Sequence, residues 1–282
     1  MTSFAALHDL TGQVAVVTGG SRGIGRAIVQ MLAEAGADVV IASRKLDACQ
    51  AAAAEVRAST GRTAVPVACH VGRWADCDRL IAESLARLGR LDVLVNNAGM
   101  SPLYDSLDAV SEELYDKTLA VNLKGPFRLA VLAATHMAAR DGGSIINIGT
   151  TASLTASVRE LPYACAKAGL NALTVGLAEA YAPKVRVNAI LPGPFRTDIS
   201  QGWAPPPGAG AVRPAGPPRR PAGDRPPGAA PGQRRVELHH WRHHPRGRRH
   251  HPQGLAHQPG APGAIACAGK NLRKPHTCYG AR

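Results

Sequence analysis

The sequence predicts an α/β fold with a doubly wound, Rossmann-like parallel sheet. Short runs of β-branched and other apolar residues alternate, over the first 200 residues, with longer stretches of helical periodicity. The short runs are apolar almost throughout, as in strands that helices cover on both faces. In addition, a glycine-rich turn separates the first run from the first helical stretch.

Six buried strands and the helices between them follow from this pattern. The expected strands are VAVVT (14 to 18), DVVIA (38 to 42), AVPVA (64 to 68), LDVLVN (91 to 96), SIINIG (144 to 149) and VRVNAIL (185 to 191). Apolar residues with helical spacing lie between them at Ile24, Ile28, Met31 and Leu32, at Leu80, Ile81, Leu85 and Leu88, and within the stretch from about 112 to 140.

The composition changes near residues 200 to 203. Residues 1 to 200 hold 19 basic and 18 acidic residues, whereas residues 201 to 282 hold 14 basic and 2 acidic residues, 15 of the 22 prolines and 8 of the 11 histidines. We therefore expect a folded domain over residues 1 to 203 that lacks its last strand. A disordered, basic Pro/Gly/Arg/His-rich tail is expected over residues 204 to 282.

Three interpretations of the tail compete: a nucleic-acid-binding arm, a disordered extension, and a shifted reading frame of the same gene. The genetic code favours the third. Read one base later, GQRRVELHHWRHHPRGRR (232 to 249) permits ASDASSYTTGAIIRVDGG, and the Trp241-Arg242 pair must then encode glycine. Under that interpretation the arginines and histidines are not selected for a ligand, and a nucleic-acid partner is not expected.

The cysteines and the N-terminal segment exclude several classes of protein. The six cysteines show no CxxC pairing, so neither a zinc site nor a disulfide framework is expected, and no metal is assigned. No stretch approaches the roughly 18 consecutive apolar residues of a membrane span. The first residues, MTSFAALHDLTGQ, lack a basic start and a long apolar segment, and we therefore expect a cytoplasmic protein.

The segment TGGSRGIG (18 to 25) follows the first expected strand and opens a helix. Glycines let the backbone approach a pyrophosphate, and the helix N-terminus offers unpaired N–H groups to it. A tight turn without a ligand is the alternative for such a motif alone. The residues expected to bind a dinucleotide here are Gly19, Ser21, Arg22, Gly23, Ile24 and Gly25.

The end of the second expected strand indicates which dinucleotide is bound. An NAD-binding fold usually places a carboxylate there against the ribose hydroxyls, but this chain has Ser43 followed by Arg44. Together with Arg22, these residues suit a 2′-phosphate, so NADP(H) is favoured over NAD(H). The alternative is that both arginines are solvated surface residues.

Tyr163 and Lys167 in YACAK lie four residues apart and therefore on one face of a helix. An ammonium beside a phenol favours the ionised phenol and brings its pKa of about 10 closer to neutrality. Such a pair suits general acid/base catalysis, although Y-x-x-x-K is common by chance.

TGGSRGIG, NNAG (96 to 99), the asparagine of VNLKG, YACAK and Pro192-Gly193 occur here in the order and spacing of the short-chain dehydrogenase/reductase family, which the chain resembles over about residues 8 to 200. The resemblance implies that Tyr163 is the catalytic acid/base and that Lys167 lowers its pKa and binds the nicotinamide ribose. It also implies that Asn122 holds a water in a proton relay. Further implied cofactor contacts are Asn96, Ala98 and Gly99 on the adenosine side, and Pro192, Gly193 and Thr197 on the nicotinamide side.

The chain departs from the family pattern at two positions. Thr150 stands where the family usually has the serine that hydrogen-bonds the substrate oxygen, and we favour it over Ser153 for this role. His70, followed by Val71, replaces the acidic residue expected near the adenine, and an imidazole there can donate or accept a hydrogen bond.

The resemblance implies an NADP(H)-dependent oxidoreductase that acts on a small carbonyl or secondary alcohol substrate, and a homo-oligomer for the intact family fold. Without its closing segment, the chain as written is expected to be poorly stable and weakly active. The alternative is a catalytically impaired dinucleotide-binding protein whose basic tail binds nucleic acid or an acidic partner.

Overall fold

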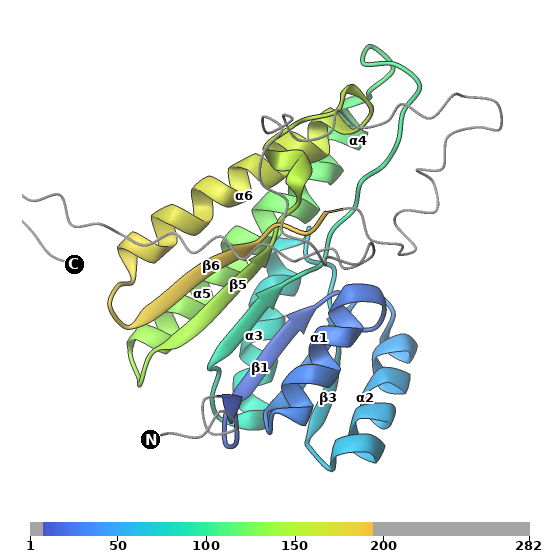
Figure 1. Cartoon of the computed structure of the whole chain (residues 1–282). Coiled ribbons are helices and arrows are strands. Elements are labelled where there is room, and N and C mark those ends of the chain that lie inside the picture. Colours follow the sequence, from blue (N-terminus) through green and yellow to red (C-terminus); the bar gives the residue numbers. More distant parts are fainter. Residues whose placement is uncertain (1–7, 194–282) are drawn as a thin grey trace, which may run out of the picture. The chain divides into compact units, whose positions relative to one another are not determined.

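A computed structural model describes residues 8 to 193, and these residues form a parallel sheet between two layers of helices (Figure 1). The strands are β1 (Val14–Thr18), β2 (Asp38–Ser43), β3 (Ala64–Ala68), β4 (Val93–Asn96), β5 (Gly143–Ile148) and β6 (Val185–Ile190). The helices are α1 (Gly23–Glu34), α2 (Leu46–Thr60), α3 (Trp74–Leu88), α4 (Glu112–Leu119), α5 (Gly125–Ala138) and α6 (Leu161–Ala180). All six strands lie within two residues of the positions that the sequence predicts.

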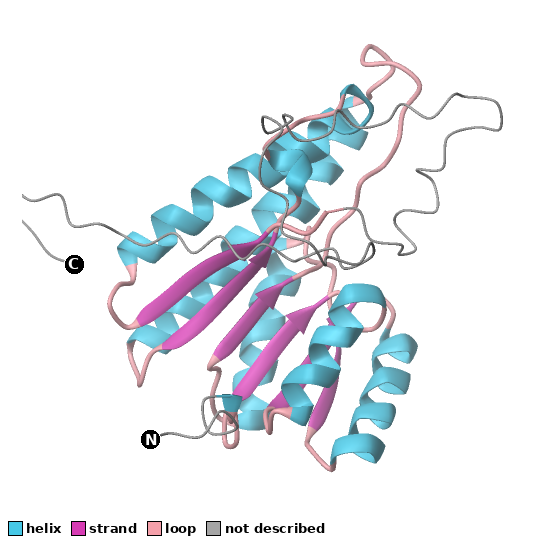
Figure 2. Cartoon of the chain, viewed as in Figure 1, coloured by secondary structure: helices cyan, strands magenta, loops and turns pink. Residues whose placement is uncertain are grey.

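The strand order is β3-β2-β1-β4-β5-β6, and all pairs are parallel, so the strands end at one common edge (Figure 2). This is the doubly wound order, and the expected fold class is confirmed. The order reverses between β1 and β4, where the connections that leave the two strands diverge to opposite faces. Ligands bind at such a point, beyond the carboxyl ends of the strands.

Two apolar cores lie on the two faces of the sheet. On one face, Val29 of α1 and Ala53 of α2 pack against alternate strand residues such as Val17. On the other face, Leu80 of α3 and Leu129 of α5 pack against the residues between, such as Val16. All five residues of β1 are buried because both faces of this central strand are covered.

The strand β6 is covered less completely within residues 8 to 193. Val185, Val187 and Ala189 are buried against the α5 and α6 face. The residues between them point to the other face, where Arg186 is exposed and Ile190 is only half-buried. The expected loss of a last strand and the expected basic tail concern residues after 193, which lie outside the described part of the chain.

The long helical stretch expected over residues 112 to 140 is interrupted. A π-helical turn, Ala120–Lys124, separates α4 from α5. Two residues account for the interruption. The side chain of Asn122 donates to the Thr118 carbonyl at 2.9 Å, and Pro126 has no N–H to donate to the Asn122 carbonyl four residues before it. Such turns occur often at functional sites.

No helix in the described part of the chain is both long and apolar enough to cross a bilayer.

Candidate active site

The glycine-rich loop makes a tight turn between β1 and α1. Gly19 and Gly23 have φ values of 64° and 55°, which favour glycine. A Cβ added to Gly25 would lie 2.2 Å from the Gly19 carbonyl oxygen, so the helix approaches the loop too closely for any side chain. Arg22 occupies the N-cap of α1 and makes no side-chain cap bond, so the N-cap side chain does not compete with an anion for the first N–H groups of the helix.

Asn97 fixes this loop, although the sequence analysis did not single it out as a site residue. Its side-chain amide donates to the carbonyl oxygens of Thr18, at 2.9 Å, and Gly19, at 3.3 Å. In return, the Thr18 hydroxyl accepts the N–H groups of Asn97 and Ala98 at 3.0 and 3.1 Å. The segment after β4 thereby holds the turn after β1, and the signal for this role was the second asparagine of NNAG.

Ser21 and Ser43, both expected to bind the cofactor, are brought together. Their hydroxyl oxygens lie 3.0 Å apart, which joins the glycine loop to the end of β2. The Ser43 hydroxyl also lies 3.0 Å from the sulfur of Cys49. Arg44 follows and is exposed, as is Arg22. Two guanidinium groups therefore accompany this pair of hydroxyls at the carboxyl edge of the sheet.

His70 and Val71 follow β3 at the same edge. The backbone N–H of His70 donates to the Asp76 carboxylate at 2.9 Å, and its ring Nδ1 accepts the N–H of Gly72 at 3.2 Å. Val71 is buried against Gly125, where an added Cβ would lie 2.2 Å from the Val71 carbonyl oxygen. The position of this loop is thus set by the first turn of α5.

Asn96 lies apart from the other proposed cofactor contacts. Its buried side-chain amide donates to the Asn147 side chain at 2.9 Å, and Asn147 donates to Thr174 of α6 at the same distance. The Asn96 side chain thus ties β4 to β5 and, through Asn147, to α6.

Gly99, Asn122 and Lys167 converge. A Cβ added to Gly99 would lie 3.0 Å from Oδ1 of Asn122 and 3.8 Å from Nζ of Lys167. The Asn122 side chain is buried and clasps Met100, donating to its carbonyl at 2.8 Å and accepting its N–H at 3.2 Å. The Lys167 ammonium donates to the Ile148 carbonyl at 2.7 Å.

Tyr163 lies between Thr150 and Lys167. Nζ of Lys167 lies 5.9 Å from the centroid of the Tyr163 ring, and the Thr150 side chain is close enough to lower the pKa of the phenol. The Ser153 hydroxyl, by contrast, donates to the Thr150 carbonyl at 2.6 Å and accepts the Asn171 amide at 2.9 Å. Since the hydroxyl of Ser153 is committed elsewhere, the geometry favours Thr150 as the partner of Tyr163.

Burial dominates the electrostatics of this group. It raises the pKa of Tyr163 to about 12, against the lowering effect of the Thr150 hydrogen bond and together with the charge of Glu160. Burial also lowers the pKa of Lys167 from 10.5 to about 8. The direction for Tyr163 is opposite to the one that the resemblance implies, because the loss of solvation outweighs the effect of its polar neighbours.

Pro192 and Gly193 follow β6, and the Pro192 carbonyl accepts the N–H of Thr151 at 3.2 Å. These residues therefore adjoin the segment that carries Thr150. Thr197, the remaining expected contact, lies outside the described residues.

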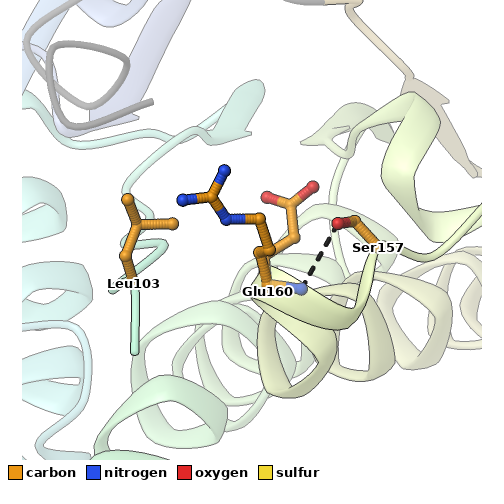
Figure 3. Close-up of a pocket in the computed structure, with 4 residues that line it drawn as sticks. Leu103, Ser157 and Glu160 are labelled. Atoms are coloured by element: carbon orange, nitrogen blue, oxygen red, sulfur yellow. Dashed lines mark hydrogen bonds between the residues drawn. The ribbon is translucent and has the colours of Figure 1, made fainter. Parts of the chain in front are cut away.

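A hollow of about 210 Å³ opens between the loop after β4 and the residues that precede α6. It is lined by Leu103, Ser157, Arg159 and Glu160, and Leu103 lies across from Glu160 and Ser157 (Figure 3). The dashed line in the figure marks the bond from the Arg159 N–H to the Ser157 hydroxyl. These residues lie between the sequence motifs, which end on either side of them, and no pattern in the sequence indicates them.

Taken together, the doubly wound sheet, the glycine loop at its switch point and the Thr150, Tyr163 and Lys167 group define a dinucleotide-dependent oxidoreductase. The family model for short chain dehydrogenases matches residues 13–207. The chain belongs to the short-chain dehydrogenase/reductase family, whose members are oxidoreductases that use nicotinamide cofactors.

Individual relatives agree with this assignment. The chain is 38% identical to dehydrogenase/reductase SDR family member 4 of Pongo abelii, over 68% of this chain and 69% of that protein. It is 39% identical to human dehydrogenase/reductase SDR family member 2, mitochondrial, over 68% of each. The crystal structure of a short-chain type dehydrogenase/reductase from Mycobacterium marinum matches with a TM-score of 0.68 and 32% identity, covering 72% of this chain and 80% of the other.

Proposed function

We propose that this protein is an NADP(H)-dependent reductase of a small carbonyl substrate, or a dehydrogenase of the corresponding secondary alcohol, with Tyr163 as the acid/base. The observation that carries the proposal is the placement of the half-buried Tyr163 phenol near the Thr150 hydroxyl and the buried Lys167 ammonium. This arrangement supplies a proton donor, a hydrogen-bond donor and a positive charge within one small volume.

The residues at the carboxyl edge of the sheet fit a dinucleotide. The turn after β1 has glycines where a side chain would clash, and the uncapped N-terminus of α1 offers N–H groups to a pyrophosphate. Ser21, Ser43, Arg22 and Arg44 offer hydroxyls and guanidinium groups to a 2′-phosphate. The absence of a carboxylate from residues 42 to 45 supports NADP(H) over NAD(H).

In the reduction, the bound nicotinamide supplies the hydride. Tyr163 gives its proton to the carbonyl oxygen, and Thr150 donates a hydrogen bond to the same oxygen as negative charge develops on it. Lys167 stabilises the phenolate that remains, and Asn122 holds the segment at Met100 against the Lys167 side of the site. Oxidation of the alcohol follows the same steps in reverse.

The experiment is the substitution Tyr163→Phe, assayed with NADPH and a panel of aliphatic and aromatic ketones and aldehydes. We expect turnover to fall by a factor on the order of 10² to 10⁴ while the Kd of NADPH is retained, because only the proton donor is removed. Tyr115→Phe is the control, since Tyr115 is an exposed tyrosine of α4. Turnover by Tyr163→Phe equal to that of the control would refute the proposal.

We also propose that residues after about 203 are written in a shifted reading frame. Three observations support this: the change of composition at residues 200 to 203, a family match that ends at residue 207, and a shifted text that resembles the SYxTG and VDGG segments with which the family fold closes. The test is to sequence the coding DNA from codon 195 onward in an independent isolate. A one-base difference that yields the VDGG ending supports the shift, and an identical frame contradicts it.

A further inference from the structure

The loop between β4 and α4, residues 97 to 111, runs along the carboxyl edge of the sheet past the catalytic group. Asn122 fixes its beginning through the two bonds to Met100. A few residues later, the loop is attached to a different element, the segment that leads into α6. Tyr104 makes this second attachment.

The hydroxyl of Tyr104 forms two short hydrogen bonds across the gap between the two segments. It donates to the Val158 carbonyl at 2.6 Å and accepts the N–H of Leu161 at 2.7 Å. Because a phenol has one proton to donate, the first bond fixes the direction of the second. The Ser101 hydroxyl adds a further tie, donating to the Glu160 carboxylate at 3.2 Å.

These bonds satisfy a backbone N–H at the start of α6 from outside the helix. The first N–H groups of a helix have no partner within it, and an N-cap side chain bonds only the second or third of them. In α6 the N-cap residue Glu160 makes no side-chain cap bond, and Pro162 has no N–H. The N–H of Leu161, the first residue of the helix, is satisfied by Tyr104 instead.

Tyr163 lies in the same helical turn as Leu161. We propose that Tyr104 is a positioning residue that caps α6 from the loop after β4. It thereby holds the Tyr163 phenol in position next to Thr150. The inference rests on the proposed function, because it assigns a role in the orientation of the acid/base. It adds a residue that lies outside the family motifs of this chain.

Tyr104→Phe removes the hydroxyl alone and leaves the ring in place. We expect kcat to fall by about 10- to 100-fold, since a displacement of about 1 Å at a catalytic group costs this much. The Kd of NADPH and the KM of the ketone most active in the panel should stay within about twofold, because the cofactor residues lie on other loops. Hydrogen exchange in the peptide covering residues 157 to 165 should become faster, since Leu161 loses its acceptor.

Tyr181→Phe is the matched control. Tyr181 is the C-cap of the same helix, and its hydroxyl lies 3.2 Å from the Thr135 hydroxyl, so the variant loses a tyrosine hydroxyl bond at the opposite end of α6. It should leave kcat and exchange in residues 157 to 165 unchanged. Ser101→Ala, combined with Tyr104→Phe, should be non-additive in kcat, because both ties hold the same segment.

Unchanged exchange in Tyr104→Phe would overturn the inference, as would faster exchange with an unchanged kcat. A fall in kcat accompanied by an equal fall in the control would also overturn it. If neither the chain as written nor the chain whose frame is shifted after about codon 203 has turnover, the proposed function fails, and exchange in residues 157 to 165 then decides by itself whether Tyr104 caps α6.

Discussion

At the scale of single residues, the contacts in the structure show that the residues of the sequence motifs have different roles. Thr150, Tyr163 and Lys167 gather around one point, whereas Asn96 of the NNAG motif holds β4 to β5 beneath it. Asn97, the next residue, acts on the glycine loop. The two adjacent asparagines of this motif therefore hold different parts of the fold in place.

Lys167 gives the first prediction, which concerns stability and pH. The pKa of Lys167 is about 8 in the folded chain and 10.5 in the unfolded chain. Between these pH values the unfolded chain therefore binds more protons than the folded chain. The free energy of unfolding should therefore rise with pH across this window. Below pH 8, burial of the ammonium costs about 3 kcal/mol, which the bond to Ile148 partly offsets.

Lys167→Met removes this titration. Relative to the wild-type chain, the variant should be most stable below pH 8 and should lose that advantage as the pH approaches 10.5. Urea unfolding at several pH values measures the difference, and other titrating groups cancel between the two proteins. A difference that does not change with pH would contradict the assignment of a buried, destabilised ammonium.

Arg44 gives a prediction on cofactor choice. Arg44→Ala should lower kcat/KM for NADPH by about tenfold, the value of one lost charge-assisted hydrogen bond, and should leave kcat/KM for NADH nearly unchanged. Arg87→Ala is the control, because Arg87 lies in the last turn of α3 and pairs with Glu83 away from the carboxyl edge of the sheet. Equal losses with both cofactors would show that Arg44 does not contact a 2′-phosphate.

At the scale of elements, the site depends on close approaches between loops and helix starts. The turn after β1 fits against α1 because Gly25 has no side chain, and the turn after β3 fits against α5 because Gly125 has none. The π-helical turn between α4 and α5 brings Asn122 to Met100. Each approach connects an expected motif to a segment distant in sequence.

Gly25→Ala tests the first of these approaches. The new Cβ would lie 2.2 Å from the Gly19 carbonyl and 2.4 Å from the Asn97 amide, so the loop must move. We expect the free energy of unfolding to fall by about 1 to 3 kcal/mol and NADPH binding to be lost. In Gly176→Ala, where nothing lies within 4 Å of the new Cβ, the helix α6 should instead gain about 0.5 to 1 kcal/mol. Thermal unfolding and NADPH fluorescence report both quantities, and similar behaviour of the two variants would argue against a tight loop.

At the scale of the whole molecule, the sheet is covered unevenly within residues 8 to 193. The strand β1 is buried on both faces, while β6 alternates between buried and more exposed residues. Parallel sheets are stable when both faces are covered, and an apolar edge favours association between molecules. Ile146 and Ile190 are the half-buried apolar residues on the incompletely covered face.

This unevenness leads to a prediction about the reading frame. A chain whose frame is shifted by one base after about codon 203 should be monodisperse, should melt at a higher temperature and should turn over ketones faster than the chain as written. Size-exclusion chromatography with light scattering, thermal unfolding and the ketone assay compare the two products. An active and monodisperse preparation of the chain as written would contradict the expectation of poor stability.

The sequence by itself determined the fold class and the positions of the strands, and it supplied the residues that we propose as the catalytic group. These follow from apolar periodicity and short motifs, which depend only on residues close to one another in the chain. The helical stretch expected over about residues 112 to 140 is present, but the π-helical turn within it, which Asn122 and Pro126 favour, was not expected from the sequence. Thr150 was favoured over Ser153 from the sequence, and the structure adds that the Ser153 hydroxyl bonds the Thr150 carbonyl and the Asn171 amide. The raised pKa of Tyr163, the clamp of Asn97 and the cap that Tyr104 provides were decided only by the tertiary structure, since burial and contacts across the sheet edge depend on residues far apart in sequence.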